Sequence, residues 1–211
     1  CRTGAISNGP TALATAHLKD SCILASAKVV LRSGGTTKQP VLLPDHEIRR
    51  LCQQRAMVSP YIEAHLNPAS LDVTLGGIIL VETEDSFDLK ELDISHHTQR
   101  DPLWIAPQEF FLAETQEIFN LPDYVGAQFV LKSSRAREGW DHAEAGWCDP
   151  GWFGSRLTME LKNSRRFHSL PIWPGMKIGQ MKFILVSGTV ERSYAETGRY
   201  NCDLMVTSSK G

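Results

Sequence analysis

The chain has 211 residues, of which 42% are hydrophobic and 22% are charged, and its formal net charge at pH 7 is −2. This balance is that of an ordinary globular protein with a core of normal size, and the charge argues against a protein held to nucleic acid mainly by neutralising phosphates. No apolar run approaches the roughly 18 residues that a membrane span needs. We therefore expect one domain with extensions, and neither nucleic acid nor a membrane as a partner.

The cysteines are spread along the chain without a C-x-x-C pair, at positions 1, 22, 52, 148 and 202. An odd count in a chain too long to need stapling predicts reduced thiols in a cytoplasmic protein, most of them small buried apolar residues. The chain begins with Cys1 rather than Met, and we expect a truncated or processed start rather than a lipoprotein start.

In chain order, the first segment is residues 1–40, which are rich in Ala, Ser, Thr and Gly and have poor periodicity. We expect these residues to form an extension before the domain. A helix is predicted from about Pro44 to Met57, with Asp45 as its N-cap and a rough apolar stripe along one side.

Short strands are predicted after this helix, because short apolar runs are separated by turn residues. In the first of them, Leu71, Val73 and Leu75 alternate with Asp72 and Thr74. The other candidates are 78–81, 110–113, 129–131, 157–161 and 178–186, and turn signals stand at Asn67-Pro68, Gly76-Gly77, Pro122-Asp123, Asp149-Pro150-Gly151 and Pro174-Gly175. Many short strands and few helices predict a mainly β domain, a barrel or a sandwich.

The metal and nucleotide motifs of common enzymes are incomplete in this chain. His142-Ala143-Glu144 reads H-x-E, the first half of the zinc-deaminase signature, but the P-C-x-x-C half is missing. With fewer than three ligands, no catalytic zinc site is expected. His96-His97 is typical of a polar loop, and the sequence contains neither a Walker A motif nor G-x-S-x-G.

Residues 126–163 contain the side chains best suited to bind a ligand or to take part in catalysis. A predicted strand is followed by Lys132-Ser133-Ser134 and then by Arg135-Ala136-Arg137. Two hydroxyls at a strand-to-helix turn can cap the amides that follow, and those amides together with Lys132 and Arg137 would form a phosphate cradle. A capped surface helix is the simpler alternative.

The same segment contains a tight turn and an alternating strand. Asp149 opens the turn, where an Asp commonly serves its own backbone. In the strand, Leu157, Met159 and Leu161 face one side, and Arg156, Thr158 and Glu160 face the other. Alternation alone would make Glu160 a solvent-facing residue.

The stretches KSSRAR, AGWCDPGW, LTMELKN and PIWPGMKIGQMKF occur in this order, preceded by VLLPDHEIRR and NPASLDVTLG. This set, over about residues 41–200, resembles the dCTP deaminase branch of the dUTPase-like superfamily. The resemblance implies a mainly β, distorted barrel with a few short helices that forms a homotrimer. It also implies an N-terminal extension (1–40), a nucleotide-binding barrel (41–188) and a C-terminal lid (189–211).

The activity that the resemblance implies is deamination of dCTP to dUTP with release of ammonia, without zinc and with Mg²⁺ accompanying the triphosphate. One carboxylate in a dry pocket can take a proton from water and deliver it to N3 of cytosine if its pKa is raised. Two alternatives stay open. One is a dUTP diphosphatase or a bifunctional enzyme with Asp149 as the water activator, and the other is a non-catalytic trimeric nucleotide-binding module.

By motif position, the resemblance assigns Glu160 as the catalytic carboxylate and Arg137 as a second catalytic residue. The residues that it assigns to substrate binding are Lys132, Ser133, Ser134, Ala145, Asp149, Thr158, Met159, Tyr194 and Arg199. Asp149 matches the residue that holds the deoxyribose 3′-hydroxyl, and Thr158 and Met159 match base contacts. Tyr194, Arg199 and Tyr200 belong to the segment that closes over the nucleotide. No residue is assigned to a metal.

The chain departs from the family pattern at four places. Glu144 stands where Thr is usual, Arg135 stands where Leu is usual, and residues 152–160 are one residue longer. In the tail, Arg199 stands where Lys is usual and Asn201-Cys202-Asp203 stands where the end is usually rich in Gln. A one-residue bulge would preserve the facing of Glu160. We expect Glu144 to alter substrate preference rather than to supply the chemistry.

Overall fold

The computed structural model describes residues 41–143 and 145–211, so the predicted extension 1–40 and Glu144 lie outside the described residues. Within these residues the helices are α1 (Asp45–Arg55), α2 (Ser133–Glu138), α3 (Tyr194–Thr197) and the short 3-10 helix η2 (Glu63–His65). The strands are β1 (Val41–Leu42), β2 (Val58–Ser59), β3 (Leu66–Asn67), β4 (Ser70–Thr83), β5 (Ser86–Asp93), β6 (Leu103–Ile105), β7 (Phe110–Asn120), β8 (Val125–Leu131), β9 (Trp140–His142), β10 (Trp147–Cys148), β11 (Phe153–Asn163), β12 (Leu170–Ile172) and β13 (Lys177–Leu185).

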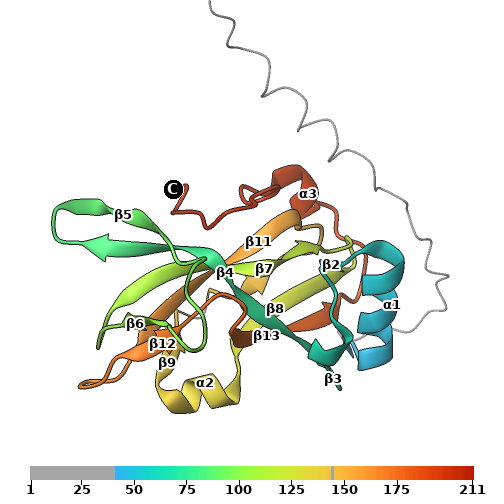
Figure 1. Ribbon diagram of the computed structural model, residues 1–211. Helices are drawn as coiled ribbons and strands as arrows, with labels where there is room; N and C mark the ends of the chain where they lie inside the picture. Colours follow the sequence, from blue (N-terminus) through green and yellow to red (C-terminus); the bar gives the residue numbers. More distant parts are fainter. Residues whose placement is uncertain (1–40, 144) are drawn as a thin grey trace, which may run out of the picture. The chain divides into compact units, whose positions relative to one another are not determined.

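The long strands form one curled antiparallel sheet in the order β10-β8-β13-β4-β7-β11-β9 (Figure 1). Strands β1, β2, β3 and β5 extend it by pairing with β13, β7, β4 and β4, and β6 and β12 form a separate pair. Near the two ends of the path, Phe129 of β8 packs edge-on against His142 of β9, with ring centres 5.4 Å apart. The predicted mainly β domain with few short helices is confirmed, as a curled sheet whose ends are joined by side-chain packing.

The predicted first helix is confirmed as α1, but its predicted N-cap is wrong. The N-cap is Pro44, whose carbonyl accepts a hydrogen bond from the Ile48 amide at 3.0 Å. Asp45 is the first residue of the helix itself. Its amide donates to Pro68 O at 2.9 Å, and its carboxylate accepts from the His46 amide. The helix buries Ile48, Leu51 and Cys52 against the sheet. Burying such side chains stabilises the fold by about 1.5–3 kcal/mol each.

The predicted turn at Gly76-Gly77 is wrong, because β4 runs straight through both residues. The register of β4 on β7 shifts between the pairs Leu75–Thr115 and Ile79–Ala113, so the glycines lie in a bulge. A Cβ at Gly76 would lie 2.4 Å from Glu114 Cγ. Glycine is required here because a neighbouring side chain approaches the backbone closely. A Gly-Gly pair looks the same in the sequence whether it forms a turn or a bulge.

Substituting Gly76 by Ala is expected to lower the free energy of unfolding by about 1–3 kcal/mol, because the added methyl group must displace the buried Glu114 side chain. Gly77→Ala is the matched control, since a Cβ there would meet Ser95 Cβ at an ordinary 3.4 Å. Chemical denaturation of both variants measures the difference. Equal stabilities of the two variants would contradict this account of the bulge.

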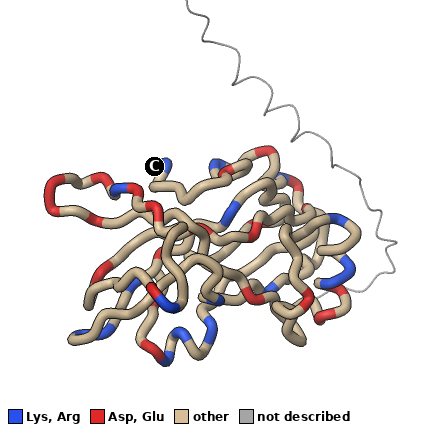
Figure 2. Tube along the Cα trace, viewed as in Figure 1, with Lys and Arg blue, Asp and Glu red and all other residues tan. Residues whose placement is uncertain are grey.

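The other four predicted turns are confirmed, because each separates two strands of the structure. The hairpin of β4 and β5 was not predicted, since acidic residues are depleted in strands. This arm carries most of its charge as carboxylates, as Figure 2 shows, and Phe87 is fully exposed near its tip. No helix within residues 41–143 and 145–211 is long and apolar enough to cross a membrane.

Candidate active site

The alternation predicted for 156–161 is confirmed in β11. Leu157, Met159 and Leu161 are buried in the core, whereas the polar residues between them are partly exposed. The register of β11 on β7 shifts between Phe153 and Ser155, where Gly154 has a φ of 65°, and again between Arg156 and Thr158. A residue in this left-handed region is usually glycine, and the later polar side chains of β11 remain on one face past the shifts.

Glu160 is half-buried on this polar face, opposite Leu112 of β7. Burial raises the pKa of the Glu160 carboxyl, and a hydrogen bond with its own backbone and the nearby His142 offset part of that rise. The Glu160 carbonyl accepts from the Ala143 amide at 3.1 Å, which fixes the strand beside β9. A carboxyl with a raised pKa in a partly dry setting is better suited to take and return a proton than a solvent-exposed glutamate.

Glu160 and Asp149 both lie near the Cys148 thiol. The thiol is buried, and burial together with the charges of Asp149 and Glu160 raises its pKa. The protonated thiol is therefore a packing residue and not a nucleophile. Asp149 itself is exposed in the turn between β10 and β11, and its carboxylate accepts a 2.8 Å hydrogen bond from Trp147 Nε1. Ala145 lies just before this turn and is exposed.

The second group of predicted residues lies on α2, which follows β8. The N-cap is Lys132, without a side-chain cap hydrogen bond, so the predicted capping by the two serines is wrong. Ser133 and Ser134 are already inside the first turn, and both are exposed, as is Arg137. The helix thus presents two hydroxyls and a guanidinium to solvent, which are groups that bind phosphate oxygens.

Arg135 has a structural role that the sequence did not reveal. Its Nε donates to the Lys177 carbonyl of β13 at 3.1 Å, and its Nη1 pairs with Glu138 at 2.7 Å. The guanidinium also lies over the Trp173 ring, 5.9 Å from its centre. These contacts tie α2 to the neighbouring strand, so Arg135 serves to hold the helix.

The C-terminal segment begins at Ser193, which caps α3 and donates to Asp123 Oδ1 at 2.5 Å. A shallow cavity of about 270 Å³ lies beside α3. It brings Tyr194 next to Asp149, two residues that lie far apart in the sequence. The full lining is Asp149, Pro150, Val190, Arg192, Tyr194 and Thr197.

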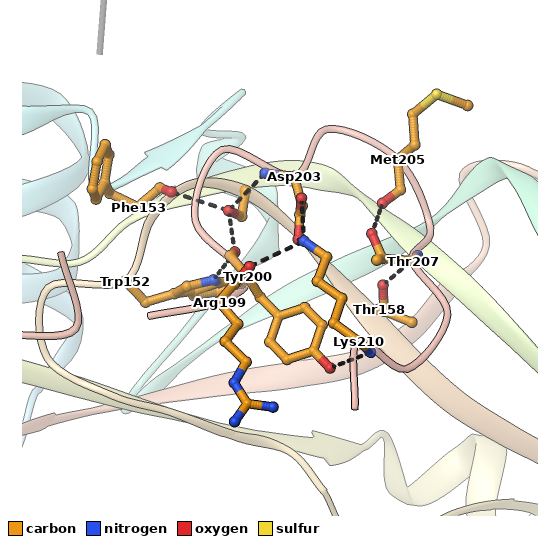
Figure 3. A network of polar contacts seen from close by, with 10 residues as sticks. Trp152, Phe153, Thr158, Arg199, Tyr200, Asp203, Met205, Thr207 and Lys210 are labelled. Atoms are coloured by element: carbon orange, nitrogen blue, oxygen red, sulfur yellow. Dashed lines mark hydrogen bonds and ion pairs between the residues drawn. The ribbon is translucent and has the colours of Figure 1, made fainter. Parts of the chain in front are cut away.

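The rest of the tail follows β11 (Figure 3). Trp152 Nε1 donates to the Tyr200 carbonyl at 2.9 Å, and the Arg156 amide donates to the Asp203 carbonyl at 2.8 Å. Lys210 closes the segment by pairing with Asp203, whereas the Arg199 side chain points away from this network.

Further along, the tail reaches the polar face of β11. The Thr207 amide donates to Thr158 Oγ1 at 3.1 Å. Val206 packs on Leu80 and Leu112, and its amide donates to Glu114 Oε2 at 3.0 Å. Since Leu112 and Glu114 are the β7 partners of Glu160 and Thr158, the tail covers the sheet directly beside Glu160.

The structure therefore places the predicted residues in two groups. One comprises Glu160, Thr158, Asp149 and Tyr194, linked through Cys148, the cavity and the tail. The other lies on α2. Met159 differs from its predicted use, because its side chain is 1% exposed in the core and only its backbone can contact a base.

Sequence reasoning missed Asp72 and Glu114. Asp72 was visible only as a polar residue in an alternating strand, a pattern that predicts exposure, yet it is buried. The Lys132 ammonium, assigned to the phosphate cradle, lies 2.6 Å from the Asp72 carboxylate. Glu114 carried no sequence signal, because its partners Gly77 and Val206 are remote in the chain.

Comparison with known proteins gives consistent matches over the same region. A family model described as dCTP deaminase-like matches residues 42–186. The chain is 36% identical over 166 residues to a "dCTP deaminase, dUMP-forming" of Acidothermus cellulolyticus, covering 73% of this chain and 85% of that protein. It is 31% identical over 178 residues to a protein of the same name from Persephonella marina, covering 81% and 97%.

A solved structure supports the fold. The 2′-deoxycytidine 5′-triphosphate deaminase of Agrobacterium tumefaciens aligns with a TM-score of 0.57 and 21% identity. The alignment covers 71% of this chain and 49% of that one, so the present chain spans about half the length of that protein.

Proposed function

The chain belongs to the dCTP deaminase-like family, and from this premise we propose that it deaminates dCTP with release of ammonia and carries the product on to dUMP. The observation that carries the proposal is the half-buried Glu160, whose raised pKa suits a proton carrier. The names of the relatives, "dCTP deaminase, dUMP-forming", support the bifunctional alternative over dUTP as the released product. The non-catalytic alternative is disfavoured because this carboxylate is retained.

In the proposed deamination, the Glu160 carboxylate takes a proton from water as the oxygen attacks C4 of cytosine. The proton passes to N3, and a second proton transfer through the same carboxyl lets the C4 amino group leave as ammonia. Thr158, on the same face, would contact the base, and backbone amides around Ala145 would donate to the developing charge. All steps use one carboxyl that changes protonation state, which a raised pKa favours.

The triphosphate is proposed to lie on α2, where Ser133, Ser134 and Arg137 are exposed and Lys132 stands at the start of the helix. In the described residues, no three His, Cys, Asp or Glu side chains gather as a metal site. The cationic and hydroxyl groups of α2 suit phosphate oxygens, and we propose that Mg²⁺ accompanies the triphosphate and neutralises part of its charge. Asp149 would hold the 3′-hydroxyl and activate water for the second hydrolysis.

A homotrimer is part of the proposal, because the family resemblance implies sites formed between chains. Light scattering of the active protein should give about three times the 23.5 kDa of one chain. An active species with the mass of a single chain would refute the homotrimer. A cytoplasmic location follows from the reduced thiols expected of the chain and stays a prediction.

Incubation with dCTP and, separately, with dUTP in the presence of Mg²⁺ tests the reaction. The proposal predicts ammonia, dUMP and pyrophosphate from dCTP. Release of ammonia with accumulation of dUTP would show that the protein is a deaminase that releases dUTP. Pyrophosphate from dUTP without any ammonia from dCTP would show that it is a dUTP diphosphatase. Binding without turnover of either nucleotide would support the non-catalytic module.

Removing the residues after Val190 is expected to lower kcat/KM for dCTP, because Tyr194, Arg199 and the segment over Thr158 are lost together. The hydrogen bonds from Trp152 and Ser155 to Tyr200 are lost as well. A shorter deletion of residues 208–211 keeps these contacts and the Thr207–Thr158 hydrogen bond, and it serves as the control for folding. Steady-state rates and melting temperatures of both deletions are the measurement, and an unchanged kcat/KM in the longer deletion would show that the tail has no part in the reaction.

A further inference from the structure

A buried carboxylate on β4 gathers four donors from three different parts of the chain. Asp72 is 5% exposed, and its Oδ1 accepts from Lys132 Nζ at 2.6 Å, Asn67 Nδ2 at 2.8 Å and Gln180 Nε2 at 3.2 Å. Its Oδ2 lies 3.3 Å from Lys177 Nζ. These partners come from β3, β13 and the start of α2, so Asp72 is the point at which these elements are joined by charge.

The charges of this cluster do not cancel. Burial alone would raise the pKa of Asp72, but hydrogen bonds from Lys132, Asn67 and Gln180 outweigh it and hold the pKa below its usual range. One ionised carboxylate thus faces two ammonium groups, leaving an excess of one positive charge. The pKa of the nearby His65 is lowered by burial and then by the charge of Lys177, while the charge of Asp72 raises it and that of Lys132 lowers it again.

Asp72 fixes a side chain whose backbone is already held. The Lys132 amide donates to Ile178 O at 3.1 Å, and the Lys132 carbonyl accepts from the Ala136 amide at 3.0 Å. The long side chain of a lysine would otherwise sample many rotamers in solvent. With 22% of its side chain exposed, Lys132 keeps a path to a ligand while its ammonium is oriented by the carboxylate.

We propose that Asp72 is a positioning residue for the triphosphate, which it serves by orienting the ammonium groups of Lys132 and Lys177 at the start of α2. The inference rests on the proposed function, since it needs a phosphate ligand on α2. Its distinctive claim is that a negative charge beside the cradle strengthens the binding of an anion. A purely electrostatic role of Asp72 predicts the reverse.

The test is the dissociation constant of 2′-deoxyuridine 5′-(α,β-imido)triphosphate with Mg²⁺, a probe with no C4 amino group to lose and no α,β-bridging oxygen to cleave. Asp72→Asn keeps the shape of the side chain and removes its charge. Binding of the probe should weaken about tenfold, the scale of one charge-assisted contact, and binding of dUMP should change less than about twofold. Asp85→Asn is the matched control, because it removes the same charge from an exposed pair with Lys90 on the hairpin arm.

Three results would overturn the inference. An unchanged constant means that Asp72 does not act on the phosphates, and tighter binding means that its charge only opposes them. Equal weakening for the triphosphate and for dUMP, with a lowered melting temperature, means a structural role.

If Asp72→Asn does not fold, the Asn67→Ala variant tests the inference instead, because it loosens the Asp72 carboxylate without removing a charge. It should weaken triphosphate binding about two- to fivefold, and unchanged binding refutes the role.

The probe separates this inference from the function on which it rests. Wild-type protein that binds the probe but releases no ammonia from dCTP refutes the proposed reaction, and the constants of the variants still decide the role of Asp72. If the wild-type protein does not bind the probe, both the proposed function and the role of Asp72 are refuted.

Discussion

Glu160→Gln is expected to slow ammonia release from dCTP by about 10²–10⁴-fold, the usual contribution of a general acid–base group, while nucleotide binding survives. The amide keeps the size and position of the carboxyl on the polar face of β11 but cannot take a proton from water. Because the side chain is only half-buried, the substitution leaves the apolar side of the strand intact. The readouts are the initial rate of ammonia release and the dissociation constant for dCTP.

Glu84→Gln provides the control, since Glu84 is an exposed carboxylate at the turn of the β4–β5 arm. Its rate should match that of the wild type. Near-normal ammonia release by Glu160→Gln would exclude Glu160 as the base, whatever the effect on binding.

The acid limb of the pH profile follows from the same group. The carboxylate form is needed to accept the proton, and burial raises the pKa of Glu160. Activity should therefore fall with decreasing pH at a higher pH than an ordinary glutamate would give, and it should recover as the pH rises above that pKa. A kcat/KM that stays constant down to the normal range of a solvent-exposed glutamate would contradict a proton carrier at this place.

Arg137→Ala is expected to have the second largest effect, because it removes the only side chain of α2 that is both exposed and positively charged within the described helix. The proposed charge-assisted contact of Arg137 to a phosphate would be lost, and kcat/KM for dCTP should fall by about tenfold to a hundredfold, corresponding to roughly 1.5–3 kcal/mol. Ser133→Ala removes a neutral hydrogen bond and should be milder.

Arg166→Ala is the matched control for charge, since Arg166 is exposed on the loop between β11 and β12. Steady-state kinetics of the three variants separate the effects. A fully active Arg137→Ala enzyme would take Arg137 out of the site, and an equal loss in Arg166→Ala would attribute the effect to overall charge.

The parts of the site that could be predicted are those set by local chemistry. The facing of Glu160 follows from the two-residue period of a strand, which continues past the register shift at Gly154. The turns at Asn67-Pro68 and Pro174-Gly175 likewise depend on backbone preferences that a few neighbouring residues set.

The parts that could not be predicted depend on partners remote in the chain. Gly76 has the same sequence signal in a turn as in a bulge, and only the approach of Glu114 decides between them. Alternation would expose Asp72, but Lys132, 60 residues away, makes its burial possible. The tail meets Thr158 through Thr207, 49 residues further on, a contact that has no pattern in the sequence.

The central claim is that this chain removes the amino group of dCTP by means of Glu160, and a single-turnover experiment tests it most directly. Wild-type and Glu160→Gln proteins in excess over dCTP, with Mg²⁺, are quenched over time, and ammonia and the nucleotides are quantified. The account predicts one ammonia for each dCTP consumed by the wild type, with dUMP as the final nucleotide, and almost no ammonia from the variant in the same interval. Loss of dCTP by the wild type without ammonia, or equal ammonia from both proteins, would contradict it.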